Sequence, residues 1–221
     1  MPARTLRERF IESEMLDHAA PDVTRASLRD LARINRYLGG YYVLRRLFGG
    51  VASAGDSFSV LDIGAASGDM GAAILRDFPG ARVTSLDYKG DHLAQAADPK
   101  LVADAFHLPF RASSFDFVFS SLFLHHFAND QVVELFRGFR CVARRAVLAI
   151  DLDRGPLAYH FLPNTRWLFG WHDITISDGQ ISVAAALKKD EMLALAVRAG
   201  LSGSRVRVHR PWSRLSLVAP V

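Results

Sequence analysis

The sequence predicts an α/β fold with a mostly parallel sheet of seven strands, an antiparallel C-terminal hairpin and an N-terminal helical cap. Two observations carry this prediction. Short apolar strand patterns alternate with helical stretches from residue 58 to residue 150, which is typical of parallel β-α-β units. Two later strand patterns, 206–208 and 215–218, are joined by a link too short to hold a crossover helix, so they are expected to pair antiparallel.

The individual elements follow from local patterns. Leu6, Phe10, Ile11 and Met15 recur at helical spacing. Pro21-Asp22 offers an N-cap for the next helix, which stops at Gly39-Gly40. The remaining helices are expected at 41–48, 69–78, 130–143 and 187–199, and the parallel strands at 58–63, 83–86, 101–103, 115–120 and 146–150. We expect a cap over 1–50, a main domain over 51–221 and, within it, a lid over 152–186.

Composition narrows the class of protein. The 221 residues, 50% of them hydrophobic, are enough to form one domain with a well-buried core but few for two domains. The net charge is +4, but no basic run is interleaved with aromatic residues, which disfavours nucleic acid as a partner. One cysteine excludes an internal disulfide and a cysteine-based zinc site. Without a signal-peptide core or an apolar run of membrane-spanning length, we expect a cytoplasmic monomer or homodimer.

The strongest motif is the glycine-rich turn between the first strand and the next helix. Gly64 and Gly68 let the backbone approach a ligand closely, and the helix N-terminus offers free N–H groups to a carboxylate. Ala65, Ala66 and Ser67 complete this loop. Such a turn lies at the carboxyl ends of the strands, where open α/β sheets bind ligands. A glycine-rich turn alone also occurs in NAD-binding domains, so further features must decide.

Acidic residues at three successive strand ends supply those features. Asp62 would repel a pyrophosphate but suits an ammonium or a sulfonium group. Asp87, followed by Tyr88, is placed to accept hydrogen bonds from ribose hydroxyls, and Asp104 ends the third strand, where an adenine would lie. The further expected cofactor contacts are Ala105, Phe106, Ser120 and Arg36, with Arg33 and Asn35 beside Arg36. Arg36 is expected to anchor a carboxylate from above, although a solvated helix face explains it equally well.

The motifs of residues 59–151 together resemble the class I methyltransferases, Rossmann-like proteins that use S-adenosylmethionine. In that family an acid, a Leu-Pro pair and a Phe-Asp strand lead to a histidine after the fourth strand, as in residues 104–110 and 114–126 here. The resemblance implies a seven-stranded sheet, S-adenosylmethionine as cofactor, S-adenosylhomocysteine as product and a methyl-transfer reaction (EC 2.1.1 type). Ala66 departs from the pattern, because the family commonly has a central glycine there.

A looser resemblance narrows the chemical class of the acceptor. Residues 14–17, 31–40 and 177–183 resemble a bacterial subgroup found with polyketide-type biosynthesis enzymes. This implies a small, largely apolar acceptor, phenolic or polyketide-like. We expect O-methylation ahead of C-methylation at a quinone or polyketide-like carbon.

The aromatic stretch 159–172 predicts a lid over the acceptor, facing the two tyrosines of the cap. The same aromatic residues would also serve to pack the cap on the sheet. Asp178 and Ser182 match the subgroup pattern, and a solvated loop explains them equally well. The expected acceptor-lining residues are Tyr41, Tyr42, His126, Tyr159, Trp167, Trp171, Asp178 and Ser182.

Methyl transfer needs an in-line approach of the acceptor and the exclusion of water, and a base where the nucleophile must lose a proton. His125 and His126 follow the fourth strand. Because adjacent strand residues point in opposite directions, we expect only one of them, His125, to act. His172, beside Asp173, is a second candidate for the base, and His160 ranks below both.

Missing motifs also matter. The chain lacks the Asn/Asp-Pro-Pro-aromatic motif of nucleic-acid amino-methyltransferases after the fourth strand, and no acid cluster there would bind magnesium. We therefore expect neither DNA, RNA nor catechol-type substrates, and no metal.

The competing hypotheses are an NAD-dependent oxidoreductase, a non-catalytic partner protein that binds S-adenosylmethionine, and a degenerate domain with an inactive pocket.

Overall fold

The computed structural model describes residues 6–15 and 21–221, without the side chains of Pro21 and Asp22. The N-cap expected at Pro21-Asp22, and Asp17 in the looser resemblance, therefore lie outside the described residues and side chains. The central sheet has the order β3-β2-β1-β4-β5-β7-β6. Its strands are β1 (Phe58–Ile63), β2 (Ala81–Asp87), β3 (Lys100–Val102), β4 (Phe115–Ser121), β5 (Ala143–Leu152), β6 (Arg205–His209) and β7 (Arg214–Pro220).

The five strands β1 to β5 are parallel, and β7 runs antiparallel to both of its neighbours, β5 and β6. The predicted parallel sheet with an antiparallel C-terminal hairpin is thus confirmed. Because β7 is reversed, its first residue, Arg214, pairs with Leu152 at the end of β5. The hairpin therefore brings residues to the edge where β1, β4 and β5 end.

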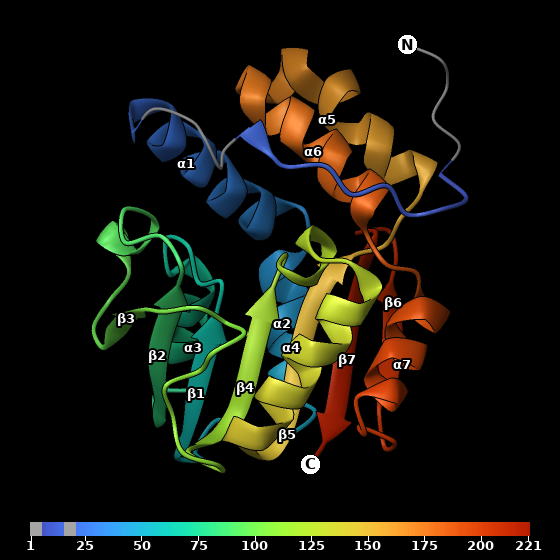
Figure 1. Cartoon of the computed structure of the whole chain (residues 1–221). Helices are drawn as coiled ribbons and strands as arrows, with labels where there is room; N and C mark the ends of the chain where they lie inside the picture. Colours follow the sequence, from blue (N-terminus) through green and yellow to red (C-terminus); the bar gives the residue numbers. More distant parts are fainter. Residues whose placement is uncertain (1–5, 16–20) are drawn as a thin grey trace.

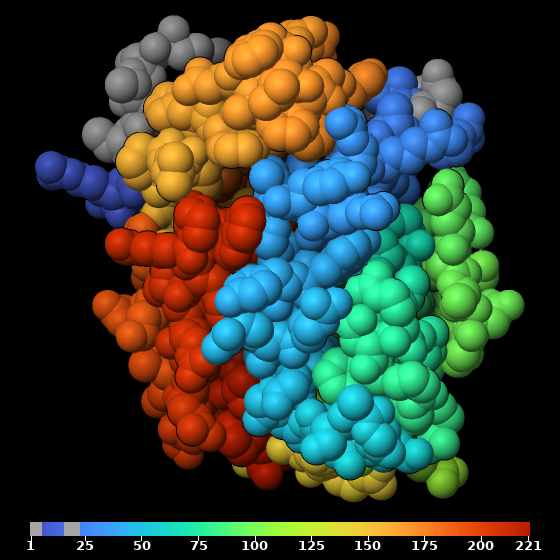
Figure 2. Space-filling view, turned by 180° about the vertical axis from the view of Figure 1, so that it is seen from behind, coloured from blue at the N-terminus to red at the C-terminus, as the bar shows by residue number. Residues whose placement is uncertain are grey.

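Helices cover both faces of the sheet (Figure 1). One face carries α4 (Asn129–Val142) and α7 (Lys189–Arg198), which contact each other and the strands beneath them. The other face, shown in Figure 2, carries α2 (Gly40–Phe48) and α3 (Asp69–Asp77). A third group lies over the carboxyl ends of the strands: α1 (Pro21–Tyr37), α5 (Pro156–Phe169) and α6 (Asp173–Ala185). Two short 3₁₀ helices, η2 (His92–Gln95) and η3 (Leu124–His126), lie in the loops.

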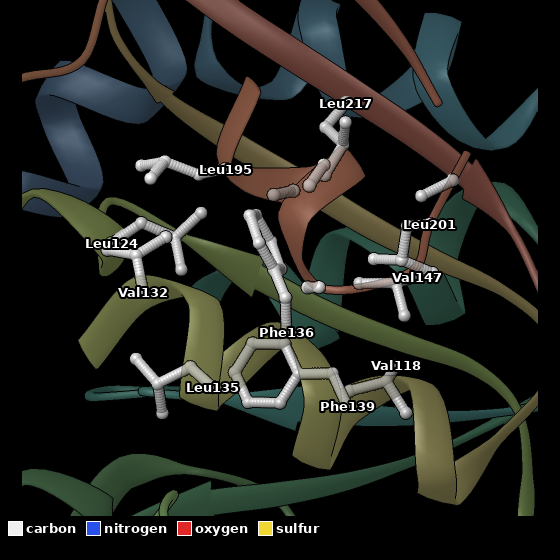
Figure 3. Close-up of a cluster of buried hydrophobic side chains, with 14 of the residues drawn as sticks. Val118, Leu124, Val132, Leu135, Phe136, Phe139, Val147, Leu195, Leu201 and Leu217 are labelled. Carbon is white, nitrogen blue, oxygen red and sulfur yellow. The ribbon is translucent and has the colours of Figure 1, made fainter. Parts of the chain in front are cut away.

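Each face of the sheet has its own apolar core. Beneath α4 and α7, fully buried Phe136 and Phe139 pack with residues of β4, β5 and β7 (Figure 3). Beneath α2, Phe48 packs edge-on against Phe117 and Phe119 and stacks on Phe58. Burial on both faces explains why these strands read as nearly continuous apolar runs in the sequence.

The expected helices at 22–38 and 41–48 are present as α1 and α2, but the helix expected at 6–15 is not. Residues 6–14 run as a non-helical segment, called the strap below, which passes between α6 and the sheet (Figure 1). Backbone groups of the strap bond to other parts of the chain: Phe10 N donates to Ala184 O, and buried Arg154 donates to the carbonyls of Leu6 and Arg7. These tertiary hydrogen bonds replace the helix that the apolar spacing predicted. The division into cap, main domain and lid stays a prediction.

Within the described residues, no helix is both long and apolar enough to cross a membrane.

Candidate functional site

The glycine-rich loop follows β1 as a sharp turn into α3. Gly64 and Gly68 have φ values of 69° and 74°, in the left-handed region that favours glycine. A Cβ on Gly64 would lie 2.4 Å from the ring of Phe123, and one on Gly68 2.7 Å from the Cβ of Ala96. Ala66 also has a positive φ, 46°, so the position where the resembled family has glycine keeps a glycine-like backbone.

The acidic strand ends lie around this loop. Asp87 accepts hydrogen bonds from Ala66 N at 2.9 Å and Lys89 N at 3.0 Å, which ties the end of β2 to the loop after β1. Asp104 accepts from Phe106 N and contacts His107 Nδ1, both at 2.9 Å. Since a carboxylate has about four lone-pair positions, both groups keep capacity for a ligand.

Asp62 is the most buried of these acids, with 1% of its surface exposed. Burial, together with the nearby carboxylates of Asp69 and Asp87, raises its pKa well above the usual range. The hydrogen bond from Gly71 N opposes this shift, and Oδ2 has no hydrogen-bond partner among the described residues. Burying a polar atom without a hydrogen-bond partner costs free energy, and a cationic or hydrogen-bonding ligand would supply that partner.

Arg214 is a buried cation that the sequence patterns did not single out. Its side chain is 1% exposed, and it donates from Nη2 to Asn35 Oδ1 at 3.2 Å and from Nε to Leu38 O at 3.4 Å. Asn35 in turn donates to Asp69 at the start of α3, 2.9 Å away. Nη1 has no hydrogen-bond partner in the part of the chain that the structure describes. Burial lowers the pKa of Arg214 to about 10, so the side chain remains a cation at neutral pH.

A buried His125–Asp151 pair stands at the ends of β4 and β5. The two atoms His125 Nδ1 and Asp151 Oδ1 are 2.6 Å apart, and both residues are at most 3% exposed. Burial lowers the pKa of His125, but the carboxylates of Asp151 and Glu14 outweigh it and raise the value to about 10. The tight contact at Nδ1 orients the ring so that Nε2 is directed away from Asp151.

Glu14 reaches this pair from the strap. Its Oε1 lies 3.5 Å from His125 Nε2 and 3.9 Å from His126 Nδ1, and it accepts a hydrogen bond from Ser182 Oγ on α6. The strap is held there by Arg9, which donates to the carbonyls of His125, Phe127 and Ala185. Glu14 was not selected from the sequence as a site residue, because only the tertiary position of the strap brings it to the histidines.

One cavity of about 950 Å³ joins most of these groups. It is lined by the glycine-rich loop, by Asp87, Asp104 and Arg214, and by Glu14 and His125. Apolar side chains of α1, α5 and α6 make up much of its wall: Leu28, Leu31, Ile34, Leu157, Ala158, Phe161, Leu162 and Val183. Its size falls at the upper end of the range of about 300–1,000 Å³ for small-molecule sites.

Most of the predicted site residues line this cavity. They are Asp62, Gly64, Ala65, Ala66, Ser67, Asp87, Tyr88, Asp104, Ala105, Phe106, His125, His126, Asp178 and Ser182. The expectation that only one of the two adjacent histidines could face inward is wrong. Leu124–His126 form the 3₁₀ helix η3, in which successive side chains are about 120° apart, unlike the alternation of a strand.

Most of the aromatic residues predicted to form the lid do not line the cavity. Trp167 is 83% exposed, and Trp171 is buried but donates to Thr165 within the helical layer. Tyr159 is half-buried outside the cavity, while Leu157, Ala158, Phe161 and Leu162 on the same helix line it. These four positions recur at helical spacing on one face of α5, and Tyr159 and Trp167 fall on other faces.

Other predicted residues also lie outside the cavity. Tyr41 donates to Asp69 at 3.1 Å, and Tyr42 is exposed beside Arg46. Arg36 is exposed and stacks over Tyr37, so it does not anchor a ligand from above. Ser120 and Gly68 are buried or half-buried behind the wall; Ser121 lines the cavity in place of Ser120.

His172 does not form the predicted pair with its acidic neighbour. It is exposed at the N-terminus of α6, where its Nδ1 accepts from Ile174 N, and it does not line the cavity. Asp173 pairs instead with Arg166 at 2.7 Å. His172 therefore caps a helix, and we withdraw it as a candidate for the base.

Comparison with known proteins relates the central part of the chain to methyltransferases. Residues 60–146 match the family model of a methyltransferase domain. This part of the chain is thus similar to a methyltransferase domain. Two of the matched solved structures, both of the plantazolicin methyltransferase BpumL, contain S-adenosylhomocysteine. None of the curated proteins matches the chain in sequence.

Solved structures share the class I fold of the methyltransferase domain. The plantazolicin methyltransferase BpumL, in complex with S-adenosylhomocysteine, is 14% identical with a TM-score of 0.67; the match covers 92% of this chain and 91% of BpumL. A methyltransferase from Aquifex aeolicus is 14% identical with a TM-score of 0.62, over 92% and 99% of the two chains. CalO1, a methyltransferase in calicheamicin biosynthesis, is 20% identical with a TM-score of 0.59, over 83% and 54%. The chain spans only 53–66% of several other matched structures.

Proposed function

We propose that the chain is an S-adenosylmethionine-dependent methyltransferase for a small, largely apolar acceptor with a hydroxyl group, and that O-methylation is its reaction. The observation that carries this proposal is the single cavity, which joins the glycine-rich loop to the His125–Asp151 pair. Apolar side chains from α1, α5 and α6 line the same cavity and suit a phenolic or polyketide-like body. The role of CalO1 as a methyltransferase in calicheamicin biosynthesis is consistent with such an acceptor.

The residues around the loop fit the cofactor. We assign Asp87 to the ribose hydroxyls, and Asp104 and Phe106 to the adenine, because all three line the cavity beside the loop. Asp62 and Arg214 would hold the amino-acid part, whose ammonium and carboxylate match the unpartnered oxygen and the unpartnered N–H group. When bound, S-adenosylmethionine supplies a methyl group on a sulfonium that is attacked in line.

At the other end of the cavity, His125 acts on the acceptor hydroxyl. Asp151 fixes the ring through Nδ1, so His125 presents Nε2 to the hydroxyl. Because the pKa of His125 is raised to about 10, the ring takes the hydroxyl proton only in its deprotonated form, and turnover by this route increases with pH. The acceptor oxygen then forms its bond to the methyl carbon as the carbon–sulfur bond breaks, and the sulfonium charge is lost. The apolar walls exclude water from this step, which favours the acceptor over hydrolysis.

Two measurements test the function. Calorimetry should show S-adenosylmethionine binding that Asp87→Ala abolishes and that Asp190→Asn, an exposed position on α7, leaves unchanged. A panel of phenols and polyketide-like aromatics should then yield S-adenosylhomocysteine, with the new methyl group on oxygen by NMR. Unchanged binding in Asp87→Ala would contradict the cofactor site. A methyl group on carbon would contradict O-methylation, and binding without turnover of any acceptor would favour a non-catalytic role.

The affinity for S-adenosylmethionine is expected to rise with pH through Asp62. Its raised pKa means that Asp62 keeps a proton in the cofactor-free protein at pH values where an ordinary aspartate is charged. The cationic cofactor favours the carboxylate, so binding releases a proton and strengthens as the pH rises toward the folded-state pKa. Calorimetry in buffers of different ionisation enthalpy would detect this proton. Asp62→Asn should remove the dependence, and a wild-type affinity independent of pH would contradict it.

A further inference from the structure

We propose that Glu14, His125 and His126 form a binding site for one divalent transition-metal ion, such as Zn²⁺, at the acceptor end of the cavity. The three residues offer one carboxylate oxygen and two ring nitrogens, and these atoms all lie within 4.8 Å of one another. Two histidines and one carboxylate are a ligand set that suits Zn²⁺ and related ions.

The distances favour a shared ion over direct hydrogen bonds. Glu14 Oε1 is 3.5 Å from His125 Nε2 and 3.9 Å from His126 Nδ1. Charge-assisted hydrogen bonds between such atoms are about 2.7–2.9 Å long, clearly shorter than both. Ligand atoms bound tetrahedrally at about 2.1 Å from zinc are about 3.4 Å apart, which is close to the two Glu14–histidine distances. The three ligand atoms lie within 4.8 Å of one another, so the two histidine rings would have to move slightly toward a bound ion.

The surroundings of the three ligands also match a metal site. Asp151 holds His125 Nδ1 at 2.6 Å, which leaves Nε2 as the metal-binding nitrogen, and Ser182 Oγ donates to Glu14 Oε1. Carboxylate and hydroxyl partners of this kind commonly orient metal ligands. The two imidazole rings lie close together, with centroids 4.3 Å apart.

The position suggests what the ion would do. All three ligands line the cavity, so a fourth coordination position would face the acceptor, as in catalytic rather than structural zinc sites. This part of the inference rests on the proposed function. With an ion bound, His125 would be one of its ligands and would no longer be the base, and the ion would supply Lewis-acid activation of the acceptor hydroxyl. The sequence predicted no metal because no cluster of acidic residues follows the fourth strand. In the structure, the carboxylate comes from Glu14 on the strap instead.

Metal binding can be measured without any acceptor. Protein stripped with chelator and titrated with ZnCl₂ should bind one ion per chain, and Co²⁺ should give the visible absorption of a four-coordinate site with histidine ligands. Glu14→Gln and His126→Ala should each weaken Zn²⁺ binding by at least about tenfold. His160→Ala, an exposed histidine on α5 outside the cavity, should bind as the wild type does.

Retained S-adenosylmethionine affinity shows that the variants fold, since Glu14 and His126 are not in the glycine-rich loop. No saturable ion in the wild type, or wild-type binding in both Glu14→Gln and His126→Ala, overturns the site. The Co²⁺ spectrum tests it even if a variant unfolds. Undiminished methyl transfer in chelator overturns the catalytic role of the ion alone. Metal binding in a protein that transfers no methyl group overturns the proposed function alone.

Discussion

Replacing His125 with alanine is expected to lower the methyl-transfer rate by about 10²- to 10⁴-fold, while the affinity for S-adenosylmethionine stays within about threefold of wild type. The reason is that the proposed acceptor contacts and the proposed cofactor contacts are different residues of one cavity. His125 lies with Asp151 and Glu14 at the acceptor end, whereas the proposed cofactor contacts Asp87 and Asp104 lie around the glycine-rich loop. The same loss is expected whether the imidazole acts as the base or as a metal ligand.

His125→Ala also leaves Asp151 as a buried carboxylate without its imidazole partner, which costs stability. His125→Asn is the matched variant, because its amide nitrogen can still donate to Asp151 while the cavity-facing ring nitrogen is gone. Turnover should be lost in both variants, with thermal unfolding and cofactor calorimetry as folding controls. His160→Ala should transfer methyl groups at the wild-type rate. Near-wild-type turnover in His125→Asn would show that this histidine does not act on the acceptor.

Replacing Arg214 with methionine is expected to weaken S-adenosylmethionine binding by at least about 30-fold. Losing one partner of a buried charged hydrogen bond costs about 2–5 kcal/mol, and 2 kcal/mol corresponds to about 30-fold in affinity. Arg214 is buried, lines the cavity and has an unpartnered Nη1 within the described residues. A cofactor carboxylate would supply that partner.

A ligand that lacks the amino-acid part makes this prediction specific. 5′-Methylthioadenosine keeps the adenosine and the sulfur but has no carboxylate, so Arg214→Met should bind it as the wild type does. Arg36→Met is the matched control, because Arg36 is exposed and stacks over Tyr37. Calorimetry with both ligands on each variant is the measurement. An equal loss for the two ligands would mean that Arg214 supports the fold of the cavity and not the carboxylate.

Residue types and spacing were sufficient to predict that the residues of the proposed cofactor site lie together. Asp62, Asp87 and Asp104 all line the cavity, because the carboxyl ends of parallel strands meet at one edge of the sheet. The turn at Gly64 and Gly68 needed only local backbone arguments, which the left-handed φ values bear out. Local sequence patterns were thus enough to identify these residues, because their positions depend only on elements that are neighbours in the chain.

The acceptor half depended on contacts between distant segments, and the sequence patterns misled there. The aromatic residues of 159–172 were conspicuous, yet helical geometry directs Leu157, Phe161 and Leu162 into the cavity instead. His125 and His126 both face inward because the chain after β4 turns into a 3₁₀ helix. An amphipathic spacing at residues 6–15 predicted a helix, but tertiary hydrogen bonds hold the strap in another conformation.

The sequence by itself determined the α/β sheet, the order of its elements and the glycine-rich loop with its acids, because strand and turn propensities are local and parallel strands end at a common edge. Only the tertiary structure brought Glu14 to the histidines and Arg214 to the cavity that the glycine-rich loop lines. Glu14 lies 111 positions before His125 on a strap held by arginine–carbonyl bonds. Arg214 reaches the site because β7 runs antiparallel to β5, so the strand that ends the hairpin begins where the parallel strands end.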